Sequence, residues 1–198
     1  MSRDLILVVC SANVCRSPYA ALLLRRGLAE RDDIEIASAG THAHDGEPIC
    51  ALVAGRMTDR AGRLASGSRT LTADLLEQAT LVLTASKDVR ADVVKLSPSA
   101  RDRTFTMVEA AHRGSGFVLS DHPDGGSLSD YVEHLDRARA TLGAVPVRTR
   151  RWGRHPDDGI SIEDRHGSRD RLHNKTLDEV EAAVSAIATQ LGGIRVRV

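Results

Sequence analysis

Short, uninterrupted apolar runs are the sequence feature that most constrains the fold of this chain. Residues 5–9 contain only leucine, isoleucine and valine, which is typical of a strand buried on both faces of a parallel sheet. Other short β-type patterns predict strands at 34–38, 80–84 and 103–107. Because helical patterns separate these strands, the sequence predicts an α/β fold, a three-layer α/β/α arrangement with a four-stranded parallel sheet.

Caps and apolar spacing indicate where the helices begin. Ser17 and Pro18 fit an N-cap followed by proline at the first helical position, with the helix running over 19–31. Thr176 and Glu179 fit a capping box for the last helix, which carries an apolar stripe. Helices are also predicted at 72–79, 86–96 and 127–142, with a loop at 114–127 and an irregular segment at 144–159.

Composition limits the class of protein. The chain has 198 residues, enough for one domain, and a formal net charge of zero, which gives no support to a nucleic-acid or membrane binder. No stretch approaches the roughly 18 apolar residues of a membrane span. The odd number of cysteines, three, argues against a disulfide-stapled secreted fold. We therefore expect functional thiols in a reducing cytoplasm.

The turn between the first strand and the first helix contains a predicted anion site. Ligands bind at the carboxyl end of such a strand, where backbone N–H groups and the helix N-terminus attract an anion. Arg16 can clamp phosphate oxygens with its planar guanidinium, and Cys10 would lie beneath the anion as a thiolate. Taken alone, without Arg16, Ser17 and Pro18 at their offsets, Cys10 would be interpreted as a buried strand-end thiol. The positions predicted to surround the anion are Ser11, Ala12, Asn13, Val14 and Cys15.

Three segments resemble the low-molecular-weight protein tyrosine phosphatase family. VCSANVCRSP at 9–18 resembles the family's C-x5-R-S-P signature near the N-terminus, and SAGTHA at 38–43 resembles its S-A-G-T segment. ATLVLTASKDVRADVV at 79–94 resembles its third strand and the following helix. The resemblance covers most of a single domain spanning 1–198, except for 112–155, which we interpret as an insertion.

The resemblance implies a two-step reaction without a cofactor. Cys10 would attack phosphorus to give a cysteinyl-phosphate that water then hydrolyses. Arg16 and the loop amides would stabilise the equatorial oxygens, and Ser17 would help the sulfur leave. Asn13 would hold the shape of the loop. The implied substrate is a phosphorylated protein, with phosphate or another tetrahedral oxyanion bound in the loop.

The family's general acid is an aspartate in a D-P-[YF] loop before the last helix, and Asp164 is the best positional match. Arg165 stands where the family has proline, and His166 stands where it has the first aromatic residue. These differences affect the rigidity of the loop and stacking on a substrate ring. Asp157 and Asp158 are competing candidates, and the absence of a functional acid is a third possibility.

Three residues of the loop bear on rate, specificity and redox protection. Ala12 stands where the family prefers glycine, and a positive φ there would strain the backbone. Val14 is aliphatic, as in the tyrosine phosphatases, whereas related arginine-phosphate phosphatases have threonine. Cys15 could form a reversible disulfide with Cys10, as in the family, or simply pack under the loop.

Two other signals are discounted, and three functions stay open. The histidines of 41–45 together with Cys50 lack zinc-ligand spacing, so no metal site is predicted. The basic segment 147–154 with Trp152 is interpreted as a solvated face. The preferred function is phosphotyrosine hydrolysis. The alternatives are a non-catalytic phosphate-binding module and an arsenate reductase that uses external thiols, because no further cysteine follows Cys50.

Overall fold

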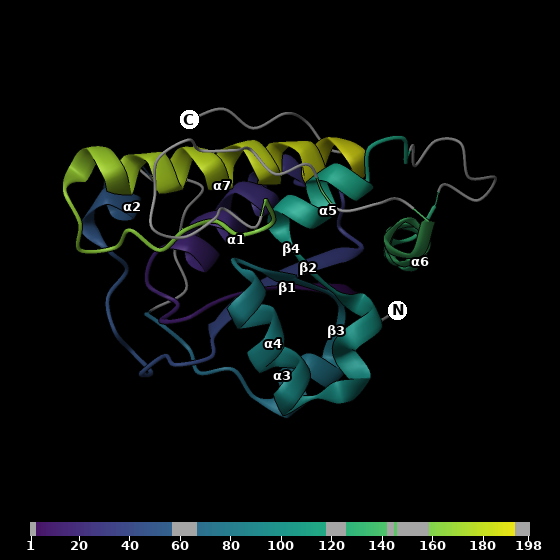
Figure 1. Ribbon diagram of the computed structural model, residues 1–198, viewed down its shortest axis with the longest axis horizontal. Coiled ribbons are helices and arrows are strands. Elements are labelled where there is room, and N and C mark those ends of the chain that lie inside the picture. The colour runs from purple at the N-terminus through teal and green to yellow at the C-terminus, as the bar shows by residue number, and fades with distance from the viewer. Residues whose placement is uncertain (1–2, 57–66, 118–125, 142–144, 146–158, 193–198) are drawn as a thin grey trace.

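A parallel sheet with the strand order β2-β1-β3-β4 forms the centre of the fold (Figure 1). The computed structural model describes residues 3–56, 67–117, 126–141, 145 and 159–192. The strands are β1 (Asp4–Cys10), β2 (Ile34–Gly40), β3 (Ala79–Thr84) and β4 (Thr104–Thr106). All neighbouring pairs are parallel, which confirms the predicted α/β fold and its four-stranded sheet.

The apolar run at the start of the chain is buried from both sides of the sheet. Successive side chains of a strand point to opposite faces. Ile6 and Val8 belong to one core cluster, whereas Leu7 and Val9 belong to another. A strand in this position needs apolar residues at every site, which explains the uninterrupted pattern.

Helices cover both faces of the sheet, as Figure 1 shows. On one side lie α1 (Arg16–Gly27), α5 (Met107–Arg113) and α7 (Asp170–Gln190), and α2 (Ala51–Arg56) contacts α7. On the other side lie α3 (Ala73–Gln78) and α4 (Lys87–Leu96), followed by the 3-10 helix η1 (Pro98–Arg103). Helix α6 (Leu128–Thr141) contributes Leu128, Tyr131 and Leu135 to the core cluster that contains Ile6 and Val8. No helix among the described residues is long and apolar enough to cross a membrane.

Local capping signals position several of these helices. Thr72 accepts a hydrogen bond from the backbone N–H of Leu75 and caps α3, within the helix predicted at 72–79. Helix α5 was not predicted, because the expected strand at 103–107 extended into it. Thr106 and Glu109 form the capping box that begins α5 and ends β4.

Helix α1 begins at Arg16, so the prediction of Ser17 as the N-cap was wrong. The N-cap residue is Cys15, and the Ser17 hydroxyl is occupied by contacts with Cys10 and Asn13. The helix also ends earlier than predicted, at Gly27. The earlier start brings the first turn of α1, with its free backbone N–H groups, directly to the end of the loop.

Candidate active site

The sulfur of Cys10 lies at the base of the loop that joins β1 to α1. Cys10 is the last residue of β1 and is 2% exposed. The Ser17 hydroxyl oxygen lies 3.0 Å from its Sγ, and the Asn13 backbone N–H donates to the same sulfur at 3.3 Å. Two polar groups that can donate to a sulfur anion therefore surround this thiol.

Asn13 holds the loop in its curled shape. Its side-chain Nδ2 donates to the hydroxyls of Ser17 at 2.8 Å and Ser38 at 3.0 Å, and its Oδ1 accepts from the Arg69 backbone N–H at 2.8 Å. Asn13 has a φ of 55°, a left-handed conformation that asparagine tolerates better than most residues. Ala12 does not have a positive φ, so the strain considered for that position does not arise.

Gly40 lets the end of β2 approach the loop closely. A Cβ at this position would lie 2.3 Å from the Ser11 carbonyl oxygen and 2.9 Å from the Asn13 nitrogen. The next residue, Thr41, donates its N–H to the Cys10 carbonyl at 3.0 Å. The glycine of the S-A-G-T segment is therefore required by contact with the loop.

Arg16 is buried at the start of α1, with 4% exposure, and part of its hydrogen-bonding capacity is unused. One terminal nitrogen donates to the Ile162 carbonyl at 3.1 Å, and the other is paired with the Asp164 carboxylate. Its Nε is buried without a partner among the described residues. Buried polar groups normally have partners, so this N–H fits an anion bound in the loop.

Asp164 reaches this arginine from the segment before α7. Its side chain is 48% exposed, and its second oxygen accepts from the His166 backbone N–H at 3.0 Å. A carboxyl group that is half exposed beside the anion site can exchange protons with a bound substrate and with water. The competing candidates Asp157 and Asp158 lie outside the described residues.

Arg165 anchors the segment that carries Asp164. Its buried guanidinium donates to Thr176 Oγ1 at 3.2 Å and pairs with Glu179 at 3.4 Å, both from α7. It also pairs with Glu163 at 2.5 Å. These contacts restrain a loop that proline restrains in the family. They also show why the predicted capping box was wrong, because Thr176 and Glu179 lie inside α7, which begins at Asp170.

The Cys15 side chain contacts His173 and lies near Cys50. Its Sγ lies 2.9 Å from His173 Nε2, and the Cys50 Sγ lies 3.8 Å from the same nitrogen. A hydrogen bond between the two thiols raises the pKa of Cys15 well above its usual range and lowers the pKa of Cys50 to about 6. No sequence motif indicated His173, although its spacing from Leu177 and Val180 puts it on the buried face of α7.

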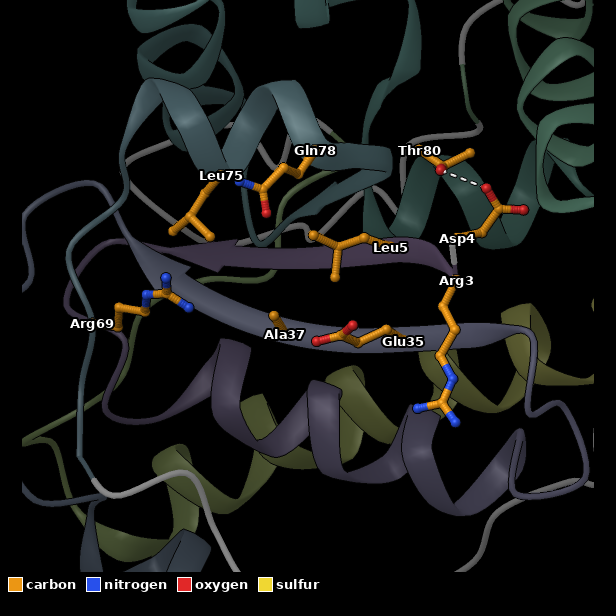
Figure 2. Close-up of a pocket in the computed structure, with 9 residues that line it drawn as sticks. All are labelled: Arg3, Asp4, Leu5, Glu35, Ala37, Arg69, Leu75, Gln78 and Thr80. Carbon is orange, nitrogen blue, oxygen red and sulfur yellow. Dashed lines mark hydrogen bonds between the residues drawn. The ribbon is translucent and has the colours of Figure 1, made fainter. Parts of the chain in front are cut away.

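A separate pocket of about 450 Å³ lies between α3 and the β1–β2 side of the sheet (Figure 2). Its lining includes Glu35, Leu75 and Thr80, and Asp4 accepts a hydrogen bond from Thr80 at 2.8 Å. Among the described residues, none of those predicted for the site lines this pocket, and its described lining has no cysteine, serine or histidine. The loop after β1 remains the candidate active site.

Comparison with known proteins agrees with the geometry. Residues 5–142 match the family model described as low molecular weight phosphotyrosine protein phosphatase. A protein-arginine-phosphatase from Geobacillus stearothermophilus is 30% identical over 69% of this chain and 90% of its own length. The low molecular weight protein-tyrosine-phosphatase Etp from Escherichia coli K12 is 33% identical over 75% of this chain and 92% of its own.

A solved structure shares the fold. The tyrosine phosphatase Wzb from Escherichia coli K30, in complex with phosphate, has a TM-score of 0.61 and 22% identity. The alignment covers 96% of this chain and 99% of Wzb. The likeness therefore extends beyond residue 142 and supports the fold assignment over nearly the whole length.

Proposed function

The chain belongs to the low molecular weight phosphotyrosine protein phosphatase family, and we propose that it hydrolyses phosphorylated side chains of proteins with Cys10 as the nucleophile. The observation that carries this proposal is the meeting of two distant segments at one anion site. The loop supplies Cys10 and Arg16, and the segment before α7 supplies Asp164, which pairs with Arg16.

In the first step the Cys10 sulfur attacks phosphorus while the bond from phosphorus to the leaving oxygen breaks. The Arg16 guanidinium and the loop N–H groups stabilise the charge on the other three phosphoryl oxygens. Asp164 gives its proton to the leaving oxygen, because a phenolate has a conjugate acid of pKa about 10 and is a poor leaving group at neutral pH. The products of this step are the alcohol or phenol and a cysteinyl-phosphate.

In the second step water attacks the cysteinyl-phosphate and the bond from sulfur to phosphorus breaks. Asp164, now ionised, accepts the proton of the attacking water. Ser17 donates a hydrogen bond to the departing sulfur, for which its distance of 3.0 Å from Cys10 is suitable. Asn13 holds the Ser17 hydroxyl and the loop in position through hydrogen bonds of its side chain.

We favour phosphotyrosine as the substrate class, with phosphoarginine as the second candidate. Val14 is aliphatic, which favours phosphotyrosine. The similarity to relatives named protein-arginine-phosphatase favours phosphoarginine. Stacking on a phenol ring gives little guidance, because every phenylalanine and tyrosine of the chain is buried: Phe105, Phe117, Tyr19 and Tyr131.

Turnover of p-nitrophenyl phosphate, with and without a chelator, tests the proposed chemistry. We expect chelator-independent hydrolysis that vanadate blocks, and a Cys10→Ser protein that still binds phosphate but does not turn over. Hydrolysis that persists in the Cys10→Ser protein would refute the role of Cys10 as the nucleophile. Phosphate binding without turnover would favour a non-catalytic module, and thiol-dependent reduction of arsenate would favour a reductase.

A pair of peptides with one sequence, carrying either phosphotyrosine or phosphoarginine, tests the substrate class. We expect a higher kcat/KM on the phosphotyrosine peptide, and the reverse order would select phosphoarginine.

Because all three cysteines are free, we also propose that the enzyme acts in the reducing cytoplasm.

A further inference from the structure

We propose that Cys15, Cys50 and His173 form a binding site for a thiophilic divalent cation, with Zn²⁺ as the best match. The two sulfur atoms and one ring nitrogen all lie within 4.8 Å of one another. The cluster shares Cys15 with the active-site loop, but the proposed two-step reaction uses none of its three side chains. It is therefore a second site next to the active-site loop.

The donor set is the kind that zinc prefers. Two cysteine sulfurs and one histidine nitrogen are soft and borderline ligands, typical of tetrahedral zinc sites. With Zn–S near 2.3 Å and Zn–N near 2.0 Å, tetrahedral coordination needs donor atoms roughly 3.5–3.8 Å apart. The observed distances from His173 Nε2 are 2.9 Å to Cys15 and 3.8 Å to Cys50. Side-chain shifts on the order of 1 Å would create the required geometry.

Rigid elements hold the three ligands. Cys15 is the N-cap of α1, Cys50 directly precedes α2, and His173 lies in the first half of α7. The Cys50 N–H also donates to the Val14 carbonyl at 2.9 Å, so the second cysteine is tied to the active-site loop by its backbone. A cation bound here would cross-link the loop to α7.

Burial leaves one side of the cluster accessible. Cys15 and His173 are each 4% exposed, whereas Cys50 is partly exposed. A cation can therefore enter past Cys50 and keep water in its fourth position, as in three-ligand zinc sites. The ring of His166, an exposed residue two positions after Asp164, packs edge-on against His173 with a centroid distance of 5.4 Å.

No sequence motif indicates this site, because its ligands are far apart in the chain. Cys15 and His173 are separated by 158 positions, so no short metal-binding motif contains both. The histidines nearest to Cys50 in the sequence, His42 and His44, are exposed and are not part of the cluster.

Metal binding to the full chain in a Cys10→Ser background tests the proposal directly. This background removes the nucleophile as a competing ligand and leaves Cys15 and Cys50 as the only thiols. Under a non-thiol reductant, Co²⁺ should produce a thiolate-to-cobalt charge-transfer band that saturates at one equivalent and disappears when Zn²⁺ is added. Competition with a chromophoric chelator then gives the affinity for Zn²⁺.

Single substitutions in the same background identify the ligands. Cys50→Ser and His173→Gln should each weaken Zn²⁺ binding by more than about tenfold, since even an outer-shell partner of a ligand is worth that much. His44→Gln is the matched control and should leave the affinity unchanged. Circular dichroism establishes that each variant is folded, and if His173→Gln is not, Cys50→Ser carries the test.

Two results would overturn the proposal. One is the absence of a charge-transfer band together with no competition for Zn²⁺. The other is equal affinity in Cys50→Ser and the His44→Gln control. Neither result bears on the phosphatase proposal, because all measurements use protein without the nucleophile and none reads turnover.

Discussion

Arg16 and Glu109 are both buried charged side chains, and the protein satisfies them in different ways. Glu109, on α5, is paired with Arg90 at 2.6 Å, Arg113 at 3.2 Å and Arg139 at 3.3 Å, and its side chain is 4% exposed. Within the part of the chain that the structure describes, Arg16 has a single carboxylate partner, Asp164, whose side chain is 48% exposed. Its Nε has no partner among the described residues.

The difference separates a structural network from a functional one. Around Glu109 three guanidinium groups share one carboxylate, Arg139 also pairs with Asp136 at 3.5 Å, and the arginines also donate to backbone carbonyls, such as that of Ala138. This arrangement joins α4, α5 and α6. At Arg16 the Nε–H group has no partner among the described residues, and the side chain of the paired Asp164 is half exposed. This arrangement suits a site at which an anion binds and is released. The following predictions test this contrast, from the largest effect to the smallest.

Arg16→Lys should lower kcat/KM by about a thousandfold, because lysine keeps the charge but loses the planar fork that holds two phosphoryl oxygens. Steady-state kinetics with p-nitrophenyl phosphate measures this change. Thermal unfolding should change little. If the variant keeps most of its turnover, Arg16 does not bind the phosphoryl oxygens.

Glu109→Gln should show the opposite behaviour. We expect the free energy of unfolding to fall by about 3 kcal/mol, because three guanidinium groups lose the carboxylate that compensates them. The same variant, once folded, should keep its kcat/KM. Urea denaturation and kinetics on one sample measure both, and a large loss of turnover without a loss of stability would contradict the contrast.

Asp164→Asn should slow hydrolysis of phenyl phosphate by about a hundredfold and hydrolysis of p-nitrophenyl phosphate far less, since only the poor leaving group needs a proton. The ratio of kcat/KM for the two substrates is the measurement. An equal effect on both would assign the acid to another residue, and Asp157→Asn and Asp158→Asn are then the next variants to measure.

Arg165→Gln should reduce turnover of phenyl phosphate by roughly tenfold, because the acid segment loses its ion pairs with Glu163 and Glu179. Arg137→Gln is the matched control, since Arg137 forms an exposed pair with Glu133 at 3.6 Å that is worth little. Equal kinetics in the two variants would mean that Arg165 does not position the acid.

The sheet and the active-site loop could be predicted because their signals are local. β1 and β3 are apolar at nearly every position, and the loop from Cys10 to Ser17 contains its own nucleophile, cation and hydroxyl within one short motif. The left-handed Asn13 was also accessible to sequence reasoning, because asparagine is one of few residues that tolerate this conformation.

Contacts between distant segments could not be predicted in the same way. Thr176 and Glu179 fit a capping box by pattern, but in the structure they bind Arg165 inside a longer helix. His173 belongs to no sequence motif, because the residue that it contacts, Cys15, is 158 positions away in the chain. Helices α2 and α5, of six and seven residues, are too short for a clear periodicity, although Thr106 and Glu109 offered a capping signal for α5.

The central claim, that Cys10 receives the phosphoryl group, is tested most directly by trapping the intermediate. Ser17→Ala should slow the departure of the sulfur in the second step, so the cysteinyl-phosphate should accumulate during turnover of p-nitrophenyl phosphate. After rapid quenching, mass spectrometry of the tryptic peptide 4–16 should find one phosphoryl group on Cys10 and none on Cys15. Continued hydrolysis with Cys10 unmodified, or a phosphoryl group on another residue, would contradict the account.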